Sequence, residues 1–269
     1  MVCLVRKRLA SSLLLLFSLA GCRGVDLARP GLDRVLGSFS GDLMRSETRQ
    51  AWDDWASARL EDGDILFDLG DGRLVMGLVN FSRLASELAD SNFSHVAIVA
   101  REDGQVLVYD TGIDGPQRCT FGEFLTSRRV RKIAAKRLRP EFRQHIPAAL
   151  AFCREIQEKR PEFDLDLKLD NDRLYCTELV ELAFRSTGLP LSEPVRIDHL
   201  PRFDRISKPT RLLIQAATNL KPDQVVFLPG NEKIGIWSCP YLELVLDTTD
   251  VTSPPLPGPD DSRLSQVAR

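Results

Sequence analysis

A cysteine opens a clearly patterned helix in the sequence, within the segment from Asp172 to Gly188. The apolar residues that follow Cys176 recur with a helical period, and Gly188 and Pro190 end the helix as a left-handed cap and a breaker do. A thiol in the first turn lies among unpaired N–H groups at the positive end of the helix dipole, and both features stabilise the reactive thiolate. Free cysteines more often pack in a core, so this segment alone leaves Cys176 either a nucleophile or a core residue.

Two apolar runs around a polar turn predict a β-hairpin, which carries the next candidate groups. The runs cover residues 94–100 and 105–110. His95 begins the first run and Asp110 ends the second, so antiparallel pairing brings the two side chains together. An imidazole can take a proton from a thiol and return one to a leaving group, while a carboxylate fixes its tautomer. Asp110 could also simply begin the turn that follows it, which aspartate does well.

Two further residues are candidates for the oxyanion site or the substrate pocket. The backbone N–H of Cys176 is expected to be one oxyanion donor, with a second donor from a side chain. Tyr175 is adjacent and could supply that donor, but it could as easily fill the core. Asp64, in a turn before the predicted strand 65–67, is expected to accept hydrogen bonds from loop N–H groups near the site.

The N-terminus predicts export. A basic stretch at 6–8 precedes a short apolar core at 13–19, which is too short to span a bilayer and is typical of a signal peptide over residues 1–21. The sequence Leu-Ala-Gly-Cys at 19–22 resembles a bacterial lipobox, which implies that Cys22 carries lipid; the alternative is a plain signal peptide with an incidental cysteine. Arg23 in place of aspartate implies, by resemblance to sorted lipoproteins, the outer membrane facing the periplasm.

Charge and cysteine content exclude several classes. The formal net charge of −2 argues against a nucleic-acid partner. A chain without excess positive charge would be held to a membrane by the acyl chains on Cys22 rather than by charge. No cysteine spacing suggests a metal site, and no C-x-x-C motif suggests redox chemistry, so neither metal nor cofactor is expected. If Cys176 is a working thiol and Cys22 a lipid site, at most one disulfide can form among Cys119, Cys153 and Cys239.

The remaining pattern predicts one α+β domain over residues 45–247, after a tether over 22–44 and before a disordered tail over 248–269. Helices are expected at 44–60, 74–88, 121–125, 140–159, 176–187 and 210–219, and strands at 65–67, 94–100, 105–110, 128–138, 225–228 and 234–237. The basic residues between 128 and 139 could form an anionic surface site, but the wet side of an edge strand is favoured. The apolar stretch 74–88 could line an acyl groove or simply pack on the sheet.

Four segments together resemble the circularly permuted papain-fold hydrolases of the NlpC superfamily, in particular the YiiX-like group: Gly63–Phe67, Phe93–Val99, Val108–Asp110 and Leu174–Val180. The resemblance covers about 62 to 185 and implies an antiparallel sheet packed against helices. It also implies that Cys176 is the nucleophile, His95 the base and Asp110 the residue that orients the imidazole. Glutamate is commoner than Asp110 in that role in the family, and serine is commoner than Thr177 after the nucleophile.

The sequence as a whole predicts an envelope-anchored cysteine hydrolase or acyltransferase with a Cys-His-Asp triad. The expected substrate contains an amide or ester bond and is either a cell-wall peptide or a lipid-type molecule, since relatives include both activities. The alternative is a catalytically silent lipoprotein of the same fold that binds an amphipathic or cell-wall ligand.

Overall fold

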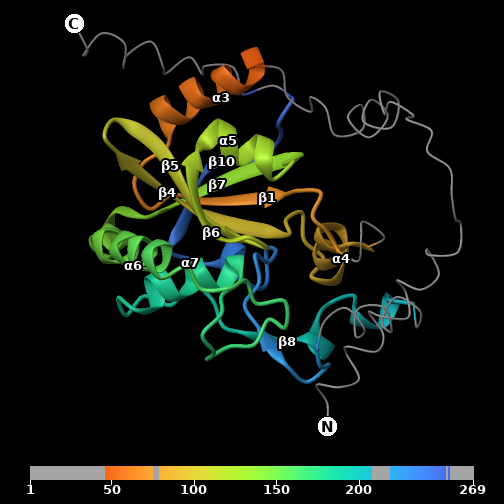
Figure 1. Cartoon of the computed structure of the whole chain (residues 1–269). Helices are drawn as coiled ribbons and strands as arrows, with labels where there is room; N and C mark the ends of the chain where they lie inside the picture. Colours follow the sequence, from red (N-terminus) through yellow and green to blue (C-terminus); the bar gives the residue numbers. More distant parts are fainter. Residues whose placement is uncertain (1–45, 75–78, 208–218, 253, 255–269) are drawn as a thin grey trace, which may run out of the picture. The chain divides into compact units, whose positions relative to one another are not determined.

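The computed structural model describes residues 46–74, 79–207, 219–252 and 254. Its main sheet is antiparallel, with six strands in the order β10-β7-β1-β4-β5-β6 (Figure 1). Several predicted segments fall outside the described residues: the signal peptide, Cys22, the tether and the chain beyond 254. Most of the predicted helix at 210–219 also falls outside them. The strands are β1 Ile65–Leu69, β4 His95–Glu102, β5 Gln105–Gly112, β6 Gly115–Thr120, β7 Lys132–Leu138 and β10 Leu242–Asp250.

Helices cover both faces of this sheet (Figure 1). The helices α3 (Ser46–Arg59) and α5 (Phe121–Ser127) lie on one face, where Trp52 and Phe124 join a core with Leu66 and Ala97 of the sheet. The helices α6 (Ile146–Lys159) and α7 (Cys176–Arg185) lie on the other face. There the core consists of alternate strand residues and apolar helix residues: Ile65, Phe67, Val96, Ile98, Leu150, Val180 and Phe184. Because successive side chains of a strand point to opposite faces of the sheet, alternate strand residues pack in two separate cores.

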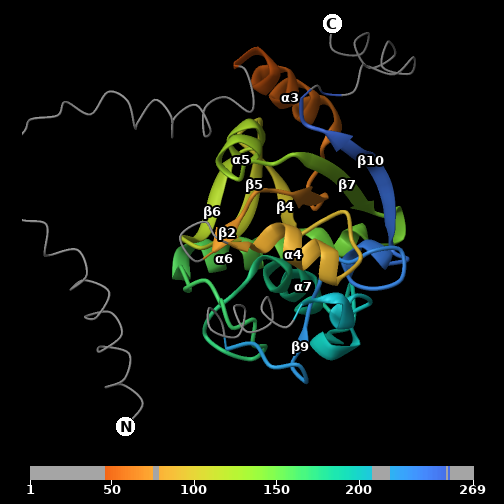
Figure 2. The ribbon, with the colours of Figure 1, turned by 90° about the vertical axis from the view of Figure 1, so that its right-hand side faces the viewer.

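Shorter elements accompany the sheet and its covering helices, among them α4 (Phe81–Leu88) and the strands β2 (Arg73–Leu74) and β9 (Val225–Val226) (Figure 2). Two small ladders pair β2 with β3 (Val79–Asn80) and β8 (Val195–Arg196) with β9. Turns of 3₁₀ helix occur at η1 Pro140–His145, η2 Ile197–His199, η3 Phe203–Arg205 and η4 Ile236–Ser238. Within the described residues, no helix is both long enough and apolar enough to cross a bilayer.

The central hairpin of β4 and β5 forms as its sequence predicts. Ile98 lies opposite Tyr109 and Glu102 opposite Gln105. Asp103 and Gly104 both take positive φ, 50° and 78°, which is the backbone that a two-residue hairpin turn requires. The register therefore starts β4 at His95 and carries Asp110 on the adjacent strand.

Several sequence predictions need correction. The stretch 74–88 is not one helix, because α4 starts only after Asn80, whose side chain caps it by accepting a hydrogen bond from the Arg83 N–H. Residues 236–238 form a 3₁₀ turn rather than a strand, and the sequence did not predict β6 or β10. The strand β10 also extends into the expected disordered tail, where Val251 is buried and its carbonyl accepts a hydrogen bond from the Trp52 indole at 2.9 Å.

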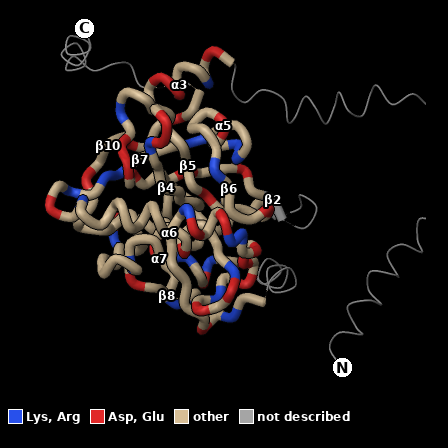
Figure 3. Tube along the Cα trace, turned by 60° about the vertical axis from the view of Figure 1, so that its left-hand side comes forward, with Lys and Arg blue, Asp and Glu red and all other residues tan. Residues whose placement is uncertain are grey.

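The basic segment 128–139 does not lie in an edge strand, and its side chains do not form one surface that could bind anions. It contains β7, which lies between β10 and β1. Arg137 is mostly buried against Asp64, and the Lys136 ammonium lies 4.2 Å from the centre of the Trp237 ring. Figure 3 shows basic and acidic residues interspersed along the described chain rather than segregated, in keeping with the small net charge. Cys119, Cys153, Cys176 and Cys239 are all free thiols.

Candidate active site

His95 lies where the sheet ends. It is the first residue of β4 and pairs with Asp68 of β1, while the preceding Ser94 N–H donates to the Asp68 carbonyl at 2.9 Å. Its side chain is only 10% exposed. Because the strand starts at this residue, the imidazole projects at the end of a rigid element rather than within the core.

Asp110 lies beside this imidazole. The distance from His95 Nε2 to Asp110 Oδ1 is 2.5 Å, and the carboxylate is almost fully buried. The contact follows from the hairpin register, which brings the end of β5 next to the start of β4. Nε2 is thereby held by the carboxylate, and the other ring nitrogen can serve the thiol.

Cys176 is the first residue of α7. Tyr175, before it, is the N-cap and has extended backbone angles, and its own side chain makes no capping hydrogen bond. The charge of the nearby His95 side chain acts to lower the pKa of this thiol. Both residues line one pocket of about 440 Å³ at the end of the sheet, together with Asp68, Ser94 and Arg128. The structure therefore brings Cys176 and His95 to a single pocket, with Asp110 buried against the imidazole and not lining it.

Arg128 is a fourth member of this cluster that sequence reasoning missed. It is the C-cap residue of α5. Its Nε lies 3.2 Å from Asp110 Oδ2, and its Nη2 lies 2.6 Å from both ring nitrogens of His95. A Cβ at Gly112 would lie 2.3 Å from Arg128 Nη1, so the missing side chain of this glycine makes room for the guanidinium. In the sequence, Arg128 is one of several basic residues between 128 and 139, and nothing distinguishes it from the others.

Asp68 is the other unforeseen member. Its side chain is buried, it lies opposite His95 in the sheet register, and it lines the pocket. Within the described part of the chain its Oδ2 has no hydrogen-bond partner. Burial raises the pKa of this carboxyl group, although His95 and Arg128 act to lower it. The only sequence signal is a charged residue within an otherwise apolar strand.

The charges of the cluster favour an ion pair between sulfur and imidazole. Burial acts to raise the pKa of the Cys176 thiol, but the His95 charge and hydrogen bond, followed by Arg128, outweigh it and lower that pKa. Burial and then Arg128 act to lower the pKa of the imidazole. The negative charges of Cys176, Asp110 and Asp68 outweigh burial and Arg128, and they raise the pKa of His95 to about 10. A thiolate beside an imidazolium is thus the expected resting state.

The two remaining sequence candidates point elsewhere. The Tyr175 hydroxyl accepts a hydrogen bond from the Phe227 N–H at 2.7 Å, so it is directed to that loop and does not line the pocket. Asp64 precedes the far end of β1, where Arg137 donates to it at 2.7 and 2.8 Å and the Glu61 N–H at 2.8 Å. It does bind a loop N–H group, but away from Cys176.

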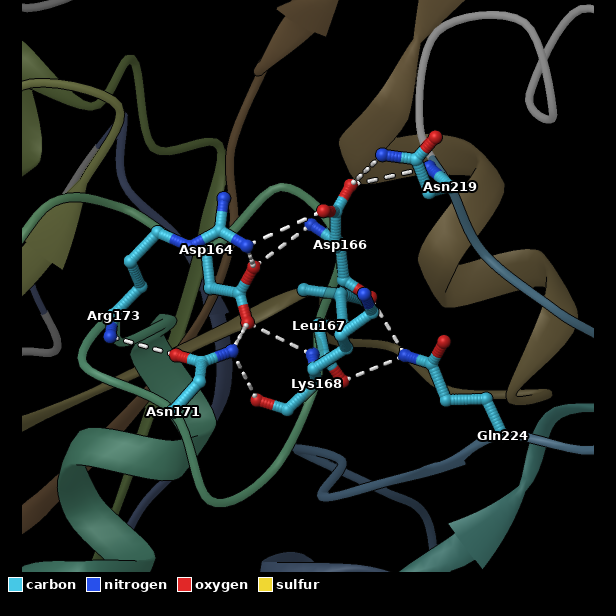
Figure 4. Close-up of polar contacts among 8 residues, drawn as sticks. All are labelled: Asp164, Asp166, Leu167, Lys168, Asn171, Arg173, Asn219 and Gln224. Atoms are coloured by element: carbon cyan, nitrogen blue, oxygen red, sulfur yellow. Dashed lines mark hydrogen bonds and ion pairs between the residues drawn. The ribbon is translucent and has the colours of Figure 1, made fainter. Parts of the chain in front are cut away.

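A loop over residues 160–174 forms one wall of the pocket through Phe163 and Leu165. Asp164, between them, is fully buried and organises the loop (Figure 4). Its carboxylate accepts hydrogen bonds from the Asp166 and Lys168 N–H groups and from the Asn171 amide, at 2.8 to 3.0 Å. This buried carboxylate therefore fixes the apolar wall next to Cys176.

The apolar helix α4 contributes to a second, separate pocket. Leu84 and Leu88 line a cavity of about 260 Å³ with Leu167, Leu200 and Phe203, and none of its described lining residues is shared with the Cys176 pocket. Among the described side chains of α4, Ser82 lines the Cys176 pocket, and its hydroxyl accepts a hydrogen bond from the Gly72 N–H.

An antiparallel sheet flanked by helices, with a cysteine at a helix start and a histidine strand earlier in the chain, defines a papain-like hydrolase fold with permuted order. Residues 59–199 match the family described as permuted papain-like amidase enzyme, YaeF/YiiX, C92 family, and the chain belongs to it. The crystal structure of the metalloprotein YiiX from Escherichia coli O157:H7 is similar, with a TM-score of 0.52 and 18% identity over 70% of this chain and 97% of that chain. No curated protein gives a significant match. The predicted family and fold class are confirmed.

Proposed function

We propose that this chain is a cysteine amidase in which Cys176 is the nucleophile, His95 the acid and base, and Asp110 the residue that orients the imidazole. The observation that carries the proposal is the meeting of a thiol at a helix start and a carboxylate-bound imidazole in one open pocket. The lowered pKa of the thiol is the electrostatic counterpart of this geometry.

The reaction follows from these positions. The Cys176 thiolate attacks the carbonyl carbon of the substrate and a sulfur–carbon bond forms. The His95 imidazolium gives its proton to the amide nitrogen, the carbon–nitrogen bond breaks, and the amine leaves a thioester on Cys176. The neutral imidazole then takes a proton from water, whose oxygen attacks the thioester carbon. The carbon–sulfur bond breaks, the acid product leaves, and the thiolate and imidazolium are restored. The N–H groups at the start of α7 lie where they can stabilise the oxyanion.

We further propose that the substrate lies in the bacterial cell envelope, as a cell-wall peptide or a lipid-linked amide. The support from sequence is the lipobox that ends at Cys22, which would tether the domain to the outer membrane on its periplasmic side. The support from the pocket is its apolar rim. Ile113 is 60% exposed and Leu165 is 37% exposed, and both line the cavity of Cys176. An amphipathic substrate would cover these side chains.

The Escherichia coli relative YiiX is described as a metalloprotein. In the described part of this chain, no group of three or more His, Cys, Asp or Glu residues is arranged to hold a metal ion. In the catalytic pocket, the Arg128 guanidinium lies against the imidazole and carboxylate that a metal would need as ligands. These residues do not fit a metal centre, and no step of the proposed reaction uses one.

Trapping the acyl-enzyme tests the proposal. The full-length protein is incubated with envelope extract and with 4-nitrophenyl acetate, and acyl adducts are located by peptide mass spectrometry. We expect an adduct on Cys176 that the Cys176→Ala variant lacks, while the Cys153→Ala variant, which changes a buried thiol of α6, keeps it. A wild-type protein that never acquires an adduct and alkylates like an ordinary thiol would favour the silent binding lipoprotein instead.

A further inference from the structure

The proposed reaction does not yet use the Arg128 guanidinium, which lies against His95 and Asp110. Its position is fixed by several contacts, because Nε lies 3.2 Å from Asp110 Oδ2 and Nη2 lies 2.6 Å from the imidazole nitrogens. The absence of a side chain at Gly112 leaves space for Nη1. Most of the Arg128 side chain is shielded from water, with 21% exposed.

Such a cation beside a base disfavours the imidazolium, which by itself would oppose the first half of the reaction. The two halves of the reaction, however, need different forms of His95. In the resting enzyme the imidazolium is paired with the thiolate. In the acyl-enzyme the sulfur carries no charge, and the imidazole must be neutral before it can accept a proton from water. The carboxylate of Asp110 alone would hold the proton on the ring at that stage.

We infer that Arg128 is a positioning residue: by neutralising the Asp110 carboxylate, it allows His95 to lose its proton in the acyl-enzyme and so to act as the base that releases the product. The inference rests on the proposed function. In the cluster of Asp110, Arg128, His95 and Cys176, the net charge is then zero both before and after acylation. Little charge therefore has to be created in the buried site during turnover.

Other charged groups face His95 and have to be considered with Arg128. Asp68 approaches from β1, Asp110 from β5 and Cys176 from α7. Cys119 on β6 acts on Arg128 rather than on the imidazole directly. Among the groups that influence His95 within the described residues, Arg128 supplies the positive charge, so its removal leaves acidic groups alone to act on the ring.

Single-turnover deacylation tests the role of Arg128. The full-length protein is acetylated at Cys176 with 4-nitrophenyl acetate, excess reagent is removed, and loss of the acetyl group is followed by intact mass across a range of pH. Relative to wild type, Arg128→Met is expected to move the midpoint of the pH profile upward by about one unit, which slows deacylation at neutral pH by ~10-fold. Arg128→Lys keeps the positive charge but lacks the planar guanidinium with its several N–H donors. Its midpoint is expected to fall between those of wild type and Arg128→Met.

Two further variants keep the test decisive. Gly112→Ala pushes the guanidinium away without removing it, so it should shift the midpoint in the same direction even if Arg128→Met fails to fold. Arg118→Met removes a half-exposed cation that pairs with Glu102, and its midpoint should stay at the wild-type value. Equal slowing at every pH, with an unmoved midpoint in both Arg128→Met and Gly112→Ala, would overturn the inference and leave the hydrolase intact. A wild-type protein that cannot be acetylated at Cys176 would instead remove the proposed function and the inference with it.

Discussion

Asp64 immediately precedes β1 and Asp68 lies four residues later, near the end of that strand, so the two-residue period of an extended chain directs both carboxylates to the same face. At 3.3 Å per residue they are separated by roughly 13 Å. Asp64 is bound by Arg137, whereas Asp68 lies across from His95 and lines the Cys176 pocket. A carboxylate paired with Arg137 thus precedes the strand, and a carboxylate that lines the Cys176 pocket lies near its end.

We expect Asp64→Asn to reduce stability without disabling the site. The change leaves the mostly buried Arg137 guanidinium with only Glu61 as a carboxylate partner among the described residues, and loss of one member of a buried pair costs about 3 kcal/mol. Urea unfolding measures this loss, and alkylation of Cys176 in the folded variant should proceed at the wild-type rate. Asp54→Asn, at an exposed position of α3, is the control and should change stability by less than ~0.5 kcal/mol. Normal stability with slowed alkylation would instead connect Asp64 to the chemistry.

Iodoacetamide should modify Cys176 at a pH where Cys119 and Cys153 are inert. The pKa of Cys176 is lowered from 9.0, whereas burial raises the pKa of Cys119 and of Cys153 to about 12. The alkylation rate of Cys176 should therefore rise with a midpoint below pH 9. A second change is expected near pH 10, where the His95 imidazolium loses its proton. Peptide mass spectrometry after short exposures gives the rate for each cysteine. A midpoint for Cys176 at or above pH 9 contradicts the ion pair.

Asp110→Asn should lower turnover by about 10²-fold or more, but less than Cys176→Ala, because the imidazole loses the carboxylate that fixes its tautomer. The amide also cannot offset the Arg128 charge. Steady-state hydrolysis of 4-nitrophenyl acetate measures the loss, and unfolding by urea verifies that the fold is retained. Full activity in this variant would assign the orienting role to another group, of which Asp68 is the nearest acidic candidate.

The parts of the structure that follow from local pattern could be predicted from the sequence, and those that depend on distant contacts could not. The helix after Cys176 and the hairpin from His95 to Asp110 follow from periodicity and a turn signal. Arg128 reaches the site only because α5 ends beside Gly112, and no sequence period encodes that approach. The end of β10 is similar, because its polar residues gain order by pairing with β7 and through the bond from Trp52 to Val251.

Glu178 gives the fold a pH dependence that can be measured apart from catalysis. It lies in the first turn of α7, is 2% exposed, and has no hydrogen-bond partner for Oε2 within the described residues. Burial, followed by the charge of Asp164, raises the pKa of Glu178 from 4.5 to about 8. Between these values the native state keeps a proton that the unfolded chain has lost. Stability should therefore fall as pH rises from 4.5 to about 8 and should level off above it.

The variant Glu178→Gln should remove this slope, because its neutral amide does not ionise in this buried position. Relative to wild type it should gain stability as pH rises through the window, by up to about 1.4 kcal/mol per pH unit, with little difference near pH 4.5. Thermal unfolding across the pH series measures both proteins. Glu158→Gln, at an exposed position of α6, should keep the wild-type slope. If Glu178→Gln and wild type lose stability in parallel, the carboxyl group of Glu178 is already ionised in the native protein at neutral pH.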